Sequence, residues 1–280
     1  MKNLLRFVAV SLLTAALSIY ACSVIMADEG SSSQGRIKVS LHSTVLDEDR
    51  EINIHLPEGY DSTIAYPVMY VLDGGSQDES VAEKLSVLTS AGSAPAVIVV
   101  GIPNINSSTR ERDLTPPFMR INNDDVNSAN GKADNFIEFI DKELIPYVDK
   151  TFHTSDYRMI FGNSRGGLFV MYTMLQNPGR FNARFCFSTP FWRQDNILTL
   201  EIEKLLESTD TVNTFIYMTA GRGETDNIKN GMSKMASVLE KKAGGITSHF
   251  EYIPGATHQD NATRSTAKAI ATWSRHFRHF

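Results

Sequence analysis

The residues most able to do chemistry lie in one short segment of the chain. Residues 162–166 read Gly-Asn-Ser-Arg-Gly, after an apolar run at 159–161 and before a helix-compatible run at 168–172. A Gly-x-Ser-x-Gly pattern between a strand and a helix forms a tight turn that exposes the serine hydroxyl. The flanking positions need glycine because larger side chains would collide with the strand and the helix. The pattern predicts that Ser164 is the nucleophile of an acyl-transfer reaction.

A serine nucleophile needs a base, and the base needs an acid to orient it. With this kind of turn, the acid follows the serine in the chain and the histidine comes last. His258 meets that order, because it follows an apparent last strand at 249–254 and precedes a final helical segment. Two acids, Glu224 and Asp226, follow the strand-like segment 213–218. Asp226 could instead cap the next helix, so Glu224 is favoured and Asp226 stays the alternative.

Stabilisation of a negatively charged oxygen requires backbone donors beside the serine. The first expected donor is the N–H of Arg165, the residue after the nucleophile. The second is expected from Gly74 or Gly75, which follow the apolar run 68–72. Glycine allows the backbone to approach a substrate closely, although a plain Asp-Gly turn is the alternative interpretation.

The elements that would position these residues alternate along the chain. Residues 37–45 and 51–56 alternate apolar and polar side chains, as half-buried antiparallel strands do. Continuous apolar runs, which are typical of buried parallel strands, occupy 68–72, 96–102, 159–161 and 215–218. Helical stretches are expected at 80–88, 133–148, 166–176, 227–242 and 262–277. The sequence predicts an α/β-hydrolase fold: a mostly parallel sheet, an antiparallel N-terminal pair and helices on both faces.

A long polar segment interrupts this alternation at residues 103–131. A loop of that length in a compact domain is usually functional or disordered, so we expect a wall or lid of the site. Phe191 and Trp192 follow another strand and are candidates for a substrate pocket, although both could equally belong to the core.

The N-terminus reads as an export signal. Two basic residues precede an apolar run at 7–20 and small residues follow, which predicts a signal peptide over 1–27. A lipoprotein signal that ends before Cys22 is the alternative, and only lipidation of Cys22 would then attach the protein to a membrane. Residues 28–35 are expected to form a flexible tether, and 36–280 a single domain. The protein is therefore expected to be periplasmic or secreted in a bacterium.

Composition excludes several classes of function. The chain has 280 residues and a net charge of −5, which becomes −7 without residues 1–27, because 25 basic and 32 acidic residues remain. An acidic protein is a poor partner for nucleic acid. Only two cysteines occur, Cys22 and Cys186, so neither a metal site rich in cysteine nor an internal disulfide is expected in the mature chain. No cofactor is implied, and the oligomeric state stays open.

Four segments together resemble a known family. They are the run 66–75 (Tyr-Pro-Val-Met-Tyr-Val-Leu-Asp-Gly-Gly), the serine turn at 162–167, the segment 188–192 and the Gly-Ala-Thr-His stretch that ends at His258. This combination is similar to the "putative esterase" family of α/β hydrolases, which includes enterobactin-type siderophore esterases, feruloyl and other carbohydrate esterases, S-formylglutathione hydrolases and mycolyltransferases. The resemblance extends from about residue 37 to the C-terminus.

The resemblance implies a substrate class as well as a reaction. The siderophore-esterase branch is the most similar in style, and S-formylglutathione hydrolase is disfavoured because its substrate is cytosolic. Arg112 and neighbouring arginines of the long loop could meet an acidic ligand, although the stretch around Arg112 is common across the family. We expect a serine esterase that works through an acyl-enzyme on a small-molecule ester. An acyltransferase or peptidase with the same residues, or an inactive fold that only binds a ligand, are the alternatives.

Overall fold

The structure, a computed structural model, describes residues 36–241 and 244–277. The predicted leader at 1–27, its Cys22 and the tether at 28–35 lie outside the described residues. Within the described ranges, no helix is both long and apolar enough to cross a membrane.

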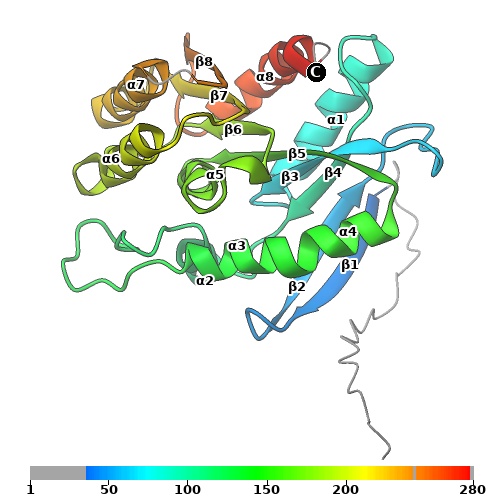
Figure 1. Cartoon of the computed structure of the whole chain (residues 1–280), viewed down its shortest axis with the longest axis horizontal. Helices are drawn as coiled ribbons and strands as arrows, with labels where there is room; N and C mark the ends of the chain where they lie inside the picture. The colour runs from blue at the N-terminus through cyan, green and yellow to red at the C-terminus, as the bar shows by residue number, and fades with distance from the viewer. Residues whose placement is uncertain (1–35, 242–243, 278–280) are drawn as a thin grey trace, which may run out of the picture.

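A mixed sheet of eight strands forms the centre of the molecule (Figure 1). Its strands are β1 (Arg36–Ser43), β2 (Glu48–His55), β3 (Tyr66–Leu72), β4 (Ile98–Ile102), β5 (Thr154–Asn163), β6 (Ala183–Phe187), β7 (Thr214–Gly221) and β8 (Ile246–Ile253). They lie in the order β1-β2-β4-β3-β5-β6-β7-β8. The pairs β1–β2 and β2–β4 are antiparallel and all other pairs are parallel. This confirms the predicted mostly parallel sheet with an antiparallel pair at its N-terminal edge.

Helices cover both faces of the sheet because the central strands are apolar on both. In β3, Val68, Tyr70 and Leu72 belong to one buried cluster, whereas Met69 and Val71 belong to the other. The helices are α1 (Gln77–Ser90), α2 (Ser107–Asp113), α3 (Ala133–Phe139), α4 (Ile145–Thr151), α5 (Arg165–Gln176), α6 (Arg193–Ser208), α7 (Asp226–Lys241) and α8 (Asn261–Phe277). Helices α1 and α8 cover one face, and α3 to α7 contribute to the cluster on the other (Figure 1).

The helices differ from the sequence expectation in three places. The expected helix at 133–148 is interrupted by a π-helix at Ile140–Leu144, next to Pro146, which has no N–H to donate. The segment 103–131, expected as a loop, contains α2. Helix α6 was not predicted, and its start is irregular because residues 194–196 have left-handed backbone angles.

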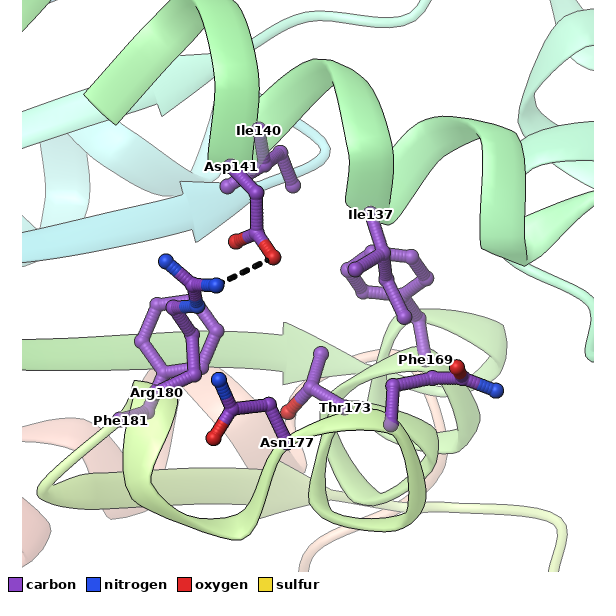
Figure 2. A pocket seen from close by; sticks show the side chains of 9 residues that line it. Ile137, Ile140, Asp141, Phe169, Thr173, Asn177, Arg180 and Phe181 are labelled. Atoms are coloured by element: carbon purple, nitrogen blue, oxygen red, sulfur yellow. Dashed lines mark ion pairs between the residues drawn. The ribbon is translucent and has the colours of Figure 1, made fainter. Parts of the chain in front are cut away.

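A small cavity lies between the π-helix and α5 (Figure 2). Asp141 and Arg180 form an ion pair of 2.7 Å beside it. Burial raises the pKa of Asp141, against the opposing effect of nearby arginines. The cavity measures about 10 Å³, which is room for about one water molecule and too little for a substrate. It is a feature of packing, and the candidate site has to lie elsewhere.

The sheet register brings the candidate segments to one edge. In the parallel strands β5, β6 and β7, Asn163 lies beside Phe187, and Phe187 lies beside Thr219. Ligands in α/β proteins bind outside the carboxyl ends of such strands. The segments that follow β3, β5, β6 and β7 therefore meet at this edge.

Candidate active site

The turn between β5 and α5 holds Ser164 in a strained conformation. Its backbone angles are φ 54° and ψ −119°, a region that a residue with a side chain rarely adopts. The turn is held by two backbone hydrogen bonds: Ser164 N–H donates to Phe187 O at 2.8 Å, and Gly167 N–H donates to Ser164 O at 2.9 Å. Such strain persists only where the surroundings enforce it and is common at reactive sites.

Gly162 is required by the close approach of the helix. A Cβ at this position would lie 2.4 Å from the backbone carbonyl carbon and oxygen of Gly166. We expect Gly162→Ala to lower the free energy of unfolding by about 2 kcal/mol, because backbone atoms cannot move aside cheaply. Urea denaturation measures this effect. Gly179→Ala is the matched control, since its Cβ would meet only Asn177 Oδ1 at 3.6 Å; an equal loss in both variants would contradict the steric explanation.

The serine lies at one end of a chain of side-chain hydrogen bonds. His258 Nε2 is 3.0 Å from Ser164 Oγ, and His258 Nδ1 is 2.8 Å from Glu224 Oε2. Because an ionised carboxylate can only accept, Nδ1 carries the proton and Nε2 is left to accept from the serine hydroxyl. The alternative acid, Asp226, begins α7 with a side chain that is 88% exposed and forms an ion pair with Lys229. Of the two predicted acids, Glu224 is therefore the one that contacts the histidine.

Glu224 is held by more partners than the sequence suggested. Its side chain is 1% exposed, and its Oε1 accepts from Ser188 Oγ at 2.6 Å and from Gly221 N–H at 2.7 Å. Asn261, at the start of α8, donates to Ser188 Oγ at 3.0 Å. Sequence reasoning missed the roles of Ser188 and Asn261. The only available signal was that Ser188 is a polar residue directly after a buried strand.

The contribution of Glu224 to the stability of the fold is expected to depend on pH. Burial tends to raise its pKa, but the hydrogen bonds from His258, Ser188 and Gly221 outweigh burial and hold the pKa below the ordinary value of about 4.3. A lowered folded-state pKa stabilises the fold fully above the unfolded value, and this contribution is lost as the pH falls through the folded value. We expect wild type to exceed Glu224→Gln in unfolding free energy at neutral pH. The difference should shrink below about pH 4, as measured by urea denaturation across pH; a constant difference would contradict this assignment.

The expected oxyanion donors are only partly free. Arg165 is the first residue of α5, so its N–H is one of those that lack a partner within the helix. Gly74 N–H, in contrast, donates to Ile102 O at 3.0 Å. Gly75 N–H donates to Asp78 Oδ1 at 2.6 Å. In this conformation, neither glycine N–H offers the free second donor that the sequence analysis expected.

The side chain of Arg165 connects the long segment 103–131 to the turn that carries Ser164. Its Nη1 donates to Thr115 Oγ1 at 2.7 Å and to Ile121 O at 3.1 Å, and its Nη2 lies 3.3 Å from Glu111 Oε1. Arg193 Nη2 donates to the same Ile121 carbonyl at 2.9 Å. Burial, followed by repulsion from Arg193, lowers the pKa of Arg165 to about 10. The segment 103–131 therefore lies against the turn that carries Ser164, where a wall of a site would be.

The three candidate pocket residues, Arg112, Phe191 and Trp192, lie in different surroundings. Arg112 is engaged by Glu48 and Asp113, each at 2.7 Å, in a network that does not include the histidine or the serine. Phe191 is 1% exposed and belongs to the core. The structure therefore places Arg112 in an ion-pair network and Phe191 in the hydrophobic core. Trp192 is half-buried and lines an open hollow between α6 and α7 of about 460 Å³.

A metal site and a reactive thiol are two further possibilities in the described part of the chain. There, no group of three or more His, Cys, Asp or Glu side chains is arranged to hold a metal ion. Cys186 is buried and carries a free thiol, whose pKa is raised by that burial. A neutral, inaccessible thiol is a poor nucleophile.

Comparison with known proteins gives a consistent picture. The model of a family described as "Putative esterase" matches residues 43–277. The ferri-bacillibactin esterase BesA of Bacillus subtilis is 28% identical over 216 residues, which cover 69% of this chain and 73% of that protein. A siderophore enterobactin esterase of Emericella nidulans is 27% identical, covering 49% of this chain and 50% of that protein.

Solved structures agree with the sequence relatives. An IroE-like serine hydrolase from Shewanella oneidensis is 30% identical with a TM-score of 0.76, and the match covers 85% of this chain and 79% of that one. The BES protein from Bacillus cereus has a TM-score of 0.77 over 89% of this chain and 99% of that one, but at 22% identity it supports the fold alone. The chain belongs to the Putative esterase family and has the α/β-hydrolase type of fold.

Proposed function

We propose that this protein is a serine esterase that hydrolyses carboxylic esters through an acyl-enzyme. The observation that carries the proposal is the continuous chain from Ser164 Oγ through His258 to the buried Glu224, with distances of 3.0 and 2.8 Å. Membership of an esterase family supports ester hydrolysis independently of this geometry. The three side chains have the donor and acceptor roles that a nucleophile, a base and an orienting acid require.

The proposed reaction has two halves. His258 Nε2 takes the proton of Ser164 as Oγ attacks the ester carbonyl, and the N–H of Arg165 stabilises the oxyanion. The imidazolium, stabilised by Glu224, returns the proton to the leaving alkoxide as the carbon–oxygen bond breaks. Water then attacks the acyl-enzyme with His258 again as the base, which releases the acid and restores Ser164. These steps require no cofactor.

The substrate class that the surroundings favour is a small ester with negative charge near the reacting bond. Arg165 and Arg193 converge on one carbonyl oxygen beside the turn that carries Ser164. Partly desolvated guanidinium groups attract anions more strongly than exposed ones do. Relatives named as siderophore esterases point in the same direction. We therefore place siderophore esters first among the substrates, ahead of feruloyl and other carbohydrate esters.

A substrate panel tests both the reaction and its class. Mature protein would be assayed on p-nitrophenyl butyrate, a catecholate siderophore trilactone, a feruloyl ester and an acetylated sugar, each with Ser164→Ala in parallel. We expect serine-dependent hydrolysis of the first two, with the larger kcat/KM for the trilactone. If kcat/KM for the neutral sugar or feruloyl ester equals or exceeds that for the trilactone, the substrate assignment is wrong. The proposal of an esterase would still stand.

Two other functions use the same fold and are separated by simple measurements. An acyltransferase or peptidase would pass the acyl group to another acceptor or cleave an amide, which product analysis detects. A hydrolase fold that only binds a ligand would not react with a fluorophosphonate probe. The polar chain around Ser164 argues against that last option, because a serine without function would not need a buried, oriented acid.

We also propose that the protein is exported, periplasmic or secreted, after removal of residues 1–27. Mass spectrometry of protein from the native compartment tests this proposal. A mature N-terminus at Asp28 would support soluble export, whereas a lipid on Cys22 would support membrane attachment. An intact N-terminus in the cytosol would overturn both.

A further inference from the structure

The loop after β3, residues 73–75, lies beside the nucleophile turn. A Cβ on Gly166 would lie 3.5 Å from Asp73 Oδ2 and 3.7 Å from the side chain of Leu72. The loop therefore packs against the first turn of α5, the helix that begins directly after Ser164. Its two glycine N–H groups differ in how tightly their surroundings confine them.

Gly74 is confined by the backbone of the neighbouring strand, whereas the Cβ position of Gly75 faces open space. Gly74 N–H donates to Ile102 O, and a Cβ on Gly74 would meet the backbone of Ile102 and Pro103 at 2.7 to 2.8 Å. Gly75 has φ +100°, and a Cβ there would have no heavy atom within 4 Å. Because its Cβ position faces open space and glycine tolerates many backbone angles, the backbone at Gly75 can rotate once its N–H leaves Asp78. Gly75 is thus the one of the two that could reach an oxyanion.

The N–H of Gly75 is held by a buried carboxylate. It donates to Asp78 Oδ1 at 2.6 Å, and Asp78 Oδ2 lies 2.9 Å from His55 Nε2. Asp78 is fully buried in the first turn of α1. A Cβ on Gly101 would lie 2.3 Å from Asp78 Oδ2, so the carboxylate fits there because residue 101 is glycine.

The charge on Asp78 follows from its partners. Burial tends to raise its pKa, but the hydrogen bonds from His55 and from Gly75 N–H outweigh burial and lower the pKa below the ordinary value. Asp78 is therefore an ionised acceptor, and hydrogen bonds to such acceptors are about twice as strong as neutral ones. A carboxylate in this place competes directly with any oxyanion for the same N–H.

We propose that Asp78 is a positioning residue that masks the second oxyanion donor, holding Gly75 N–H in the resting protein and yielding it when Ser164 attacks. The alkoxide-like oxygen of the tetrahedral intermediate is more basic than a carboxylate, so it is the better acceptor. His55 keeps its contact with Asp78 Oδ2, which leaves the released carboxylate partnered. This inference rests on the proposed esterase function. It adds to the activation free energy of the first step, because Gly75 N–H must leave Asp78 Oδ1 before it can donate to the oxyanion.

Asp78→Asn tests the mask, because the amide keeps the shape and an acceptor oxygen but loses the charge. We expect the second-order rate of fluorophosphonate labelling to rise about fivefold, because the neutral acceptor competes less strongly. The affinity for an alkylboronic acid, whose oxygen occupies the oxyanion position, should rise by a similar factor. An unchanged or slower reaction would overturn the mask. A slower reaction with a lower melting temperature would assign Asp78 to helix capping alone.

Two controls keep the result interpretable. Asp113→Asn also removes a buried carboxylate, but one that pairs with Arg50 and Arg112, and it should leave the labelling rate unchanged. If Asp78→Asn does not fold, a crystal structure of the wild-type boronate adduct decides: the mask requires Gly75 N–H on the boronate oxygen, and a retained bond to Asp78 refutes it. If wild type itself fails to react with either reagent, the esterase proposal fails instead.

Discussion

Replacement of Ser164 by alanine should reduce the hydrolysis of p-nitrophenyl butyrate by roughly 10⁴-fold or more, to the level of residual binding and oxyanion stabilisation. The reason is geometric, because Ser164 Oγ lies 3.0 Å from His258 Nε2, the nitrogen that is proposed to take its proton. The change removes a single oxygen from a turn that backbone hydrogen bonds hold in place. Steady-state kinetics and fluorophosphonate labelling measure the effect.

The fold should survive this substitution, which makes the result specific. Alanine and serine face similar strain at φ 54°, and the bonds from Ser164 N–H and to Ser164 O involve only backbone atoms. The melting temperature of Ser164→Ala is therefore expected to stay close to that of wild type. Full activity in a folded Ser164→Ala variant would contradict the proposed mechanism, because another nucleophile or an activated water would then have to attack the ester.

The sequence could predict those parts of the site that depend on local pattern. The Gly-x-Ser-x-Gly turn is defined by neighbours within five residues, and its conformation at Ser164 matches the expectation. The alternation of strands and helices places the carboxyl ends of the parallel strands at one edge, which is enough to bring His258 near the serine. The predicted proximity of these two residues is confirmed, while their catalytic roles stay predictions.

The remaining parts depend on packing between distant segments. Glu224 and Asp226 share one loop, and only the path of that loop buries the first and exposes the second. Nothing in the pattern around Gly75 reveals that its N–H donates to Asp78, whose other oxygen contacts His55, because that requires the position of β2 against α1. Arg112 looked like a ligand for a substrate, yet its partners Glu48 and Asp113 satisfy it.

Helix α6 is an element of secondary structure that the sequence pattern did not predict. Its apolar residues Leu198, Ile202 and Leu206 are spaced four apart and buried, which is a helical signal. The left-handed residues 194–196 at its start give it no ordinary N-terminal signature. The helix was therefore missed because its start is irregular and most of its side chains are polar, although its buried apolar residues are spaced as in a helix.

The second large effect is expected for the acid. Glu224→Gln should lower kcat by roughly 10⁴-fold, because an amide in this position can donate its N–H to His258 Nδ1 and stabilise the wrong tautomer. Asp226→Asn is the matched control, since it removes an exposed carboxylate two residues away that forms an ion pair with Lys229. Its kcat is expected to stay within about twofold of wild type, as surface changes of this kind are small.

The comparison of kcat with KM separates orientation of the histidine from damage to the site. Glu224 is buried behind His258, so its loss should lower kcat and leave KM for a small ester nearly unchanged. A drop in kcat for Asp226→Asn but not for Glu224→Gln would reverse the assignment of the acid. Little effect of either substitution would mean that Ser164 and His258 work as a pair. The contacts from Ser188 and Gly221 would then serve only to keep a buried carboxylate satisfied.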